Sequence, residues 1–232
     1  QTCALPIFPV VEKMTEFDQI LALSAEAGQP AQLGIRVKLA SVAPGPWTKS
    51  GGSLSKFGVT LPELVEAADR LLAAGQGDVL RLLHFHLGSQ IGDVAALKAA
   101  VKEITRIYAH LVKRGVPLEY LDVGGGLGIN YDALPLGGGR GGVDYSMQEY
   151  ANAIVYAVQE ICDAEGVPHP TIVSENGRAV TAHHSVLVVD VLGMTSKPSV
   201  PDGFVLEADT HPIARELDTL RRAALEAPGL GE

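Results

Sequence analysis

The chain has 232 residues, of which 47% are hydrophobic and 19% are charged, enough for a sizeable core in one domain with an appendage. The net charge is −9 and the Lys and Arg residues are scattered, which argues against a nucleic-acid partner. No apolar run reaches the roughly 18 residues of a membrane span. Cys3 and Cys162 form no CxxC or zinc spacing, so we expect a protein of the reducing cytoplasm with no membrane partner.

Strand and helix patterns alternate from the start of the chain. Residues 8–12 predict a strand that resembles the second half of one already under way, so the chain is expected to begin within a fold. A helix follows from Thr15, with Phe17 and Ile20 on one face. Residues 33–38 predict the next strand. The Gly, Ser and Pro residues of 43–57 then predict a long loop that is a candidate for function.

The alternation continues over the rest of the chain. Further helices are predicted at 62–74, 94–113 and 148–164, and further strands at 79–86, 120–123, 171–175 and 185–193. Six strands with helices between most of them are typical of a parallel sheet. A glycine cluster at 137–142 predicts a mobile loop. From Met194 onward the composition changes and is rich in prolines and acidic residues. The spacing of Leu217, Leu220 and Ala224 in this part predicts a helix.

We therefore predict an α/β fold in two parts. Residues 1–193 are expected to form an incomplete (β/α)8 barrel, and residues 194–232 a linker and the start of a truncated helical appendage. In such a barrel the active site is built at the carboxyl ends of the strands. Cys162 falls on the apolar side of a predicted helix and is expected to be a buried free thiol.

Polar residues and glycines follow three of the predicted strands. His86 and Ser89 follow the first, the stretch 122–128 (DVGGGLG) follows the second, and Glu175 with Arg178 follows the third. An imidazole can stack on an aromatic cofactor, and a hydroxyl and glycine amides can hold a phosphate. A carboxylate can pair with a pyridine nitrogen. In this order the three pieces favour a pyridoxal phosphate site.

Each piece also has a simpler interpretation. The glycines fit neither the GxGxxG fingerprint nor a Walker loop, and a tight strand-to-loop turn is the common alternative. His86 can be a buried histidine satisfied by backbone, and Glu175 and Arg178 can form a local ion pair. Lys56, in a Gly/Ser loop, is expected to be solvated and not to form a Schiff base.

A metal site is not predicted. The four histidines that suggest one are His84, His86, His183 and His184. A metal site requires three ligands that converge on one ion, and only the alternating positions 84 and 86 are expected to face the same way.

Five segments carry a resemblance to a known family; they are residues 34–41, 55–58, 84–90, 121–131 and 174–184. Together they resemble the fold-type III pyridoxal phosphate decarboxylases, whose barrel is of the alanine racemase type. Within this group, the loop around Trp47, the double histidine after Arg178 and the stretch 121–131 are most similar to the biosynthetic arginine decarboxylases.

The resemblance implies a role for each matched position. His86 would stack on the pyridine ring with Arg36 behind it, and Glu175 would pair with the pyridine nitrogen, which makes His86 and Glu175 the catalytic candidates. The other implied cofactor contacts are Ser89, Gly124, Gly125, Gly126, Gly177 and Arg178. The implied substrate-binding residues are Leu121, Asp122, Val123, Gly124, Gly125, Gly126, Leu127, Gly128, Ile129, Asn130 and Tyr131.

The implied activity is the decarboxylation of L-arginine to agmatine and CO2, a step toward putrescine and spermidine, by a dimer-based homo-oligomer associated with Mg2+. The Schiff-base lysine of the family lies upstream of Phe8 and has no counterpart in this chain, nor does the carboxy-terminal β domain. We therefore expect an internal piece that is inactive and poorly soluble alone. The alternatives are a diaminopimelate or ornithine decarboxylase of the same fold, or a non-catalytic pyridoxal phosphate carrier.

Overall fold

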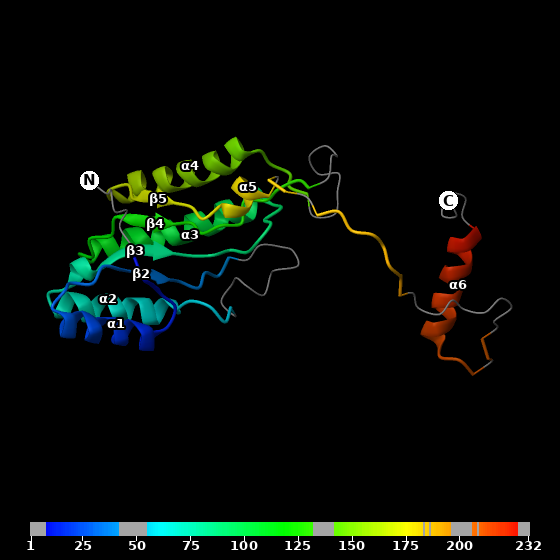
Figure 1. Cartoon of the computed structure of the whole chain (residues 1–232), viewed down its shortest axis with the longest axis horizontal. Helices are drawn as coiled ribbons and strands as arrows, with labels where there is room; N and C mark the ends of the chain where they lie inside the picture. The colour runs from blue at the N-terminus through cyan, green and yellow to red at the C-terminus, as the bar shows by residue number, and fades with distance from the viewer. Residues whose placement is uncertain are drawn as a thin grey trace. The chain divides into compact units, whose positions relative to one another are not determined.

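The computed structural model describes residues 8–41, 55–131, 142–182, 184–185, 187–195, 206–207 and 209–226. The chain divides into two compact units, Gln1–Val186 and Leu187–Glu232, which are described separately here (Figure 1). Most of the predicted loop at 43–57 and most of the glycine cluster at 137–142 lie outside the described residues. Among the helices that are described, none is long and apolar enough to cross a membrane.

A five-stranded parallel sheet forms the centre of the first unit. Its order β1-β2-β3-β4-β5 follows the chain. The strands are β1 (Val10–Val11), β2 (Leu33–Arg36), β3 (Leu80–His84), β4 (Tyr120–Asp122) and β5 (Thr171–Val173). Because all five run in one direction, their carboxyl ends share one edge of the sheet. The register sets His84 opposite Asp122, and Asp122 opposite Val173.

Helices connect the strands and pack beside them (Figure 1). They are α1 (Met14–Ala27), α2 (Leu61–Ala73), α3 (Val94–Lys113) and α4 (Met147–Glu165), followed after β5 by the short α5 (Gly177–Thr181). Capping boxes fix the starts of α2 and α4, in which Thr60 and Ser146 exchange hydrogen bonds with Glu63 and Glu149. The parallel α/β fold is confirmed, and successive β/α units of this kind are the building blocks of a (β/α)8 barrel.

The core lies between the sheet and the helices. Leu80 and Leu83 of β3 and Leu97 and Ile104 of α3 are fully buried, as the spacing of the apolar residues predicts. In α4 the predicted buried thiol is confirmed, because Cys162 is a buried free cysteine. Burial raises the pKa of its thiol to about 11, so the thiol stays protonated at neutral pH.

The predicted elements differ from the structure mainly in strand length and number. The sixth strand, predicted at 185–193, is wrong, because the described residues of this stretch adopt no strand. Its apolar side chains are exposed, with Leu187 at 87% and Leu192 at 98%. The strands predicted at 79–86 and 171–175 end two residues earlier than expected. Thr15 lies inside α1, whose cap position is Lys13.

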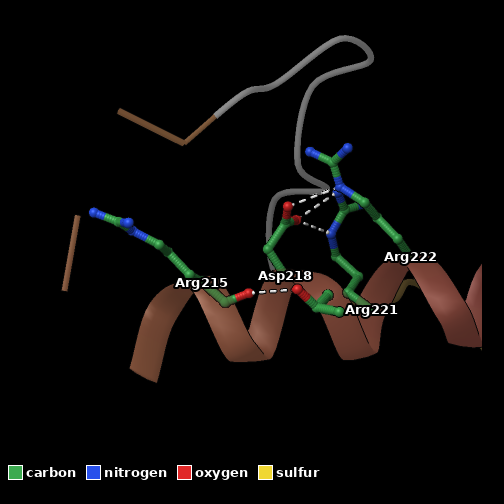
Figure 2. Close-up of polar contacts among 5 residues, drawn as sticks. Arg215, Asp218, Arg221 and Arg222 are labelled. Atoms are coloured by element: carbon green, nitrogen blue, oxygen red, sulfur yellow. Dashed lines mark hydrogen bonds and ion pairs between the residues drawn. The ribbon is translucent and has the colours of Figure 1, made fainter. Parts of the chain in front are cut away.

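The second unit contains the helix α6 (Pro212–Glu226), which confirms the predicted helical spacing. Asp218 of this helix accepts hydrogen bonds from Arg221 and from Arg222, each at 2.8 Å. Figure 2 draws these contacts. Such pairs three and four residues apart stabilise an exposed helix modestly.

Candidate functional site

A cavity of about 230 Å³ opens beyond the carboxyl ends of β3, β4 and β5. It is lined by His86, Ser89, Gly125, Gly126, Leu127, Glu175, Asn176 and Arg178. All three predicted pieces therefore contribute to one space, which the parallel direction of the strands makes possible.

His86 lies two residues beyond β3 and is half-buried. Burial and the nearby Arg36 guanidinium lower the pKa of its imidazole, so the ring is neutral at neutral pH. Arg36 ends β2, forms an ion pair with Glu12 at 2.5 Å, and lies 5.0 Å from the centre of the Phe57 ring. Arg36 and His86 also line a common small pocket.

The glycine loop brings the ends of three strands into close backbone contact. Gly124 has a φ of +67°, and a Cβ on it would lie 2.5 Å from the carbonyl oxygen of Phe85. A Cβ on Gly125 would lie 2.6 Å from the carbonyl oxygen of Glu175. The amide of Glu175 donates to the carbonyl of Gly124 at 2.8 Å. These glycines are therefore required for packing as well as for opening the cavity.

Arg178 forms hydrogen bonds with two hydroxyl groups at the cavity. Its guanidinium donates to Ser89 Oγ at 3.1 Å and to Tyr131 Oη at 2.8 Å. A guanidinium beside a hydroxyl suits a phosphate group. Arg178 and Ser89 line the cavity, and Tyr131 adjoins it through its hydrogen bond to Arg178. Glu175 is exposed and adds a carboxylate to the same space. Gly177, also predicted to contact the cofactor, begins α5 and is not among the residues that line the cavity.

Only part of the stretch predicted to bind substrate faces the cavity. Gly125, Gly126 and Leu127 line it. The others are placed differently: Leu121, Asp122, Val123, Gly124 and Gly128 are buried, Ile129 and Asn130 are partly buried, and Tyr131 is exposed.

Three residues that the sequence did not single out hold this stretch in place. Gln90 exchanges two hydrogen bonds with the backbone of Ile129, at 2.5 and 3.1 Å. Tyr145 accepts from the amide of Gly128 at 3.2 Å, and Asn176 accepts from the amide of Leu127 at 3.2 Å. Gln90 and Asn176 fall within the segments that carry the resemblance, but nothing in their local pattern indicates these partners.

A buried polar pair lies next to the cavity. Nδ1 of His84 is 3.0 Å from Oδ2 of Asp122, and both side chains are less than 10% exposed. Oδ1 of Asp122 accepts from the amide of Gly124 at 2.9 Å, which anchors the glycine loop.

The other residues that the sequence analysis considered do not line the cavity where the structure describes them. Lys56 is exposed and lies 5.1 Å from the Phe57 ring. His183 lies outside the described residues, and His184 is exposed.

The comparisons with known proteins agree on one family. The model of the pyridoxal-dependent decarboxylase, pyridoxal binding domain, matches residues 7–182. The biosynthetic arginine decarboxylase of Rhodopirellula baltica is 53% identical over 191 residues, which cover 82% of this chain and 28% of the relative.

Two solved structures are similar in fold and sequence. The biosynthetic arginine decarboxylase from Campylobacter jejuni matches with a TM-score of 0.67 at 30% identity, over 92% of this chain and 34% of that chain. Diaminopimelate decarboxylase from Helicobacter pylori, complexed with L-lysine, matches with a TM-score of 0.60 at 28% identity, over 75% of this chain and 40% of that chain. The chain thus spans about a third of the length of the arginine decarboxylases it matches.

Proposed function

This chain belongs to the pyridoxal-dependent decarboxylases, and we propose that it forms part of a biosynthetic arginine decarboxylase that converts L-arginine to agmatine and CO2. The observation that carries the proposal is the convergence of His86, Glu175 and Arg178 on one cavity, in a chain 53% identical to such an enzyme. We assign residues 1–193 to the pyridoxal-binding barrel and 194–232 to the start of an appendage.

The side chains of the cavity fit pyridoxal phosphate. The cavity offers an imidazole for an aromatic ring, a carboxylate for a pyridine nitrogen, and a hydroxyl with a guanidinium for a phosphate. When bound, the cofactor supplies an electron sink for the electrons released as CO2 leaves the amino acid. We assign His86 to the face of the pyridine ring and Glu175 to its nitrogen.

The remaining residues hold these groups in position. Arg178 and Ser89 bind the phosphate, helped by the glycine loop, and Arg36 supports His86. Asp122 anchors the loop through the amide of Gly124. Within the stretch 121–131, we assign substrate contact to the residues that face the cavity or adjoin it, from Gly125 to Leu127 and at Tyr131. The other residues of that stretch act by keeping the loop in place.

The wider setting follows from the proposed reaction. Agmatine formation leads toward putrescine and spermidine, and we place the enzyme in the cytoplasm as a dimer-based homo-oligomer. Mg2+ is the cation that the family resemblance implies. Mg2+ prefers oxygen ligands in octahedral geometry, whereas the one three-residue cluster found in the described part of the chain includes a histidine nitrogen. That cluster does not fit Mg2+, and no step of the reaction is assigned to the ion.

A substrate panel on the complete protein tests the proposal. The protein that contains these residues, loaded with pyridoxal phosphate, is expected to release CO2 from L-arginine with a kcat/KM at least tenfold above that for L-ornithine or diaminopimelate. A preference for either of the other amino acids would replace arginine decarboxylase with the corresponding relative of the same fold. Equal inactivity on all three, with the cofactor bound, would instead favour a non-catalytic pyridoxal phosphate carrier.

The diaminopimelate alternative rests on a specific observation. The Helicobacter pylori diaminopimelate decarboxylase shares this fold with a TM-score of 0.60. The higher TM-score of 0.67 and the 92% coverage of this chain by the Campylobacter jejuni enzyme favour arginine.

A further inference from the structure

The loops that follow β3 and β4 lie side by side at the cavity. Ile91 forms a parallel bridge with Leu127, and its amide donates to the carbonyl oxygen of Gly126 at 2.9 Å. The loops approach so closely that a Cβ on Gly126 would overlap with the carbonyl oxygen of Gly88. The backbone of one loop therefore continues the pairing that β3 and β4 begin.

Gln90 extends this pairing with its side chain. Its Nε2 donates to the carbonyl oxygen of Ile129 at 2.5 Å, and its Oε1 accepts from the amide of Ile129 at 3.1 Å. The side-chain amide thus bonds to Ile129 as a neighbouring strand would. Gln90 has a φ of +54°, and among the described residues it is the only non-glycine residue with a positive φ. Such a backbone is unfavourable for a residue with a Cβ, so the side-chain contact has to offset it.

The contacts of Arg178 close a ring that passes through Gln90. Ser89 directly precedes Gln90, and Tyr131 lies two residues beyond Ile129. Nη2 of Arg178 donates to Ser89 Oγ at 3.1 Å, and Nη1 donates to Tyr131 Oη at 2.8 Å. The guanidinium therefore bonds to both loops, and Gln90 bonds the loops to each other. The distance between the two hydroxyls depends on the contact of Gln90 with Ile129.

We propose that Gln90 is a positioning residue that holds the guanidinium of Arg178 ready for a phosphate group. The inference rests on the proposed function, in which Arg178 and Ser89 bind the phosphate of the cofactor. An arginine side chain loses much rotamer freedom when it is ordered, and a guanidinium already held by two hydroxyls loses less on binding. Gln90 therefore favours a phosphorylated ligand over the same ligand without its phosphate.

The test compares pyridoxal phosphate with pyridoxal, which lacks the phosphate. Each is titrated into the complete protein that contains these residues, freed of its cofactor, and the absorbance of the ligand follows binding. Gln90→Ala should weaken binding of pyridoxal phosphate about 5- to 20-fold and binding of pyridoxal less than about twofold, because Gln90 acts on the phosphate alone.

Gln148→Ala is the matched control. Gln148 is exposed on α4, and its Nε2 donates to Asn152 Oδ1 of the same helix at 2.9 Å. Its removal deletes the same amide group far from the ring of contacts in sequence, so the affinity for both ligands should stay unchanged.

Two further variants separate positioning from a loss of folding. In an Arg178→Gln background, Gln90→Ala should change the affinity for pyridoxal phosphate by less than about twofold, because its effect passes through the guanidinium. Gln90→Gly removes the same side chain, and glycine adopts a φ of +54° without strain. It therefore keeps the test available if Gln90→Ala does not fold, which circular dichroism checks.

Three results would overturn the proposal while the unmodified protein still binds pyridoxal phosphate, which leaves the proposed function standing. They are an unchanged affinity for pyridoxal phosphate in the Gln90 variants, an equal loss for pyridoxal, and an equal loss in the Arg178→Gln background. Failure of the unmodified protein to bind pyridoxal phosphate would reject the proposed function and this inference together.

Discussion

The carboxyl ends of β4 and β5 contribute to the same cavity but are built differently. At the end of β4, its last residue Asp122 and the following Val123, Gly124 and Gly125 are buried. A Cβ added at either glycine would lie closer to a neighbouring backbone oxygen than van der Waals contact allows, so neither position has room for a side chain. After β5, Glu175 and Arg178 are exposed, and α5 has no buried residue.

The difference separates two tasks within one site. The β4 end fixes the shape of the cavity through packing, so changes there should lower stability. The β5 end presents charged groups to a ligand, so changes there should lower binding and leave stability nearly unchanged.

β5 itself is only partly covered. Thr171 is exposed, and Ile172 and Val173 are partly buried. A groove of about 350 Å³ with a mainly apolar lining runs between α4, β5 and α5.

The largest effect is expected from Gly124→Ala. The residue has a φ of +67°, and the new Cβ would lie 2.5 Å from the backbone oxygen of Phe85. Left-handed backbone and overpacking together should lower the free energy of unfolding by about 2 to 4 kcal/mol. Urea unfolding of the first unit, followed by circular dichroism, measures the change.

Gly177→Ala is the matched control from the β5 side. A Cβ at Gly177 meets nothing within 4 Å, so the free energy of unfolding should change by less than about 0.5 kcal/mol. Equal destabilisation by both variants would contradict the division between the two strand ends.

A smaller effect is expected from removing the buried hydroxyl of Tyr145. This hydroxyl donates to the carbonyl of Ile91 at 2.5 Å and accepts from the amide of Gly128 at 3.2 Å. Tyr145→Phe leaves both buried groups without this partner and should cost about 1 to 3 kcal/mol in the free energy of unfolding. The same urea experiment measures it.

Tyr131→Phe makes the same chemical change at an exposed position. Tyr131 is 58% exposed, so its loss of a hydroxyl should alter the free energy of unfolding by less than about 0.5 kcal/mol. If Tyr131→Phe proved as destabilising as Tyr145→Phe, burial would not be the cause of the effect.

The smallest effect is expected in α6, where the polar contacts of Asp218 are only partly buried and lie within one helix. Hydrogen bonds from Arg221 and then Arg222 lower the pKa of Asp218. A lowered pKa means that the charged form stabilises the helix above the ordinary pKa of an aspartate, and this stabilisation is lost as the pH falls through the lowered value. Backbone chemical shifts of α6 should therefore report a slight loss of helix on acidification, smaller in Asp218→Asn than in the unmodified chain. An identical pH response in the two chains would contradict this.

The sequence predicted the helices better than the strands. α3 was predicted with its observed bounds, because its apolar stripe is long and Gly115 lies just beyond its end. The strand predicted at 185–193 is wrong because an apolar run indicates a tendency to be buried and not the neighbour that buries it. Its residues Leu187 and Val191 remain exposed.

The candidate site was predicted in outline but not in its contacts. Residues at strand ends could be grouped because parallel strands share an edge, so His86, Glu175 and Arg178 were expected together. The pairing of His84 with Asp122 depends on the register between β3 and β4, which no local pattern encodes. The same holds for Gln90 and Ile129, which are joined across 39 residues.

Binding of pyridoxal phosphate to the chain tests the central claim most directly. Equilibrium dialysis of the 232-residue chain should show one cofactor bound per chain. In Arg178→Gln the affinity should fall about 10- to 100-fold, the range expected for losing charge-assisted hydrogen bonds to phosphate. Arg114→Gln, which changes an exposed arginine paired with Asp69, should bind as the unmodified chain does. Saturable binding that is unaffected by Arg178→Gln, or no saturable binding at all, would contradict the account.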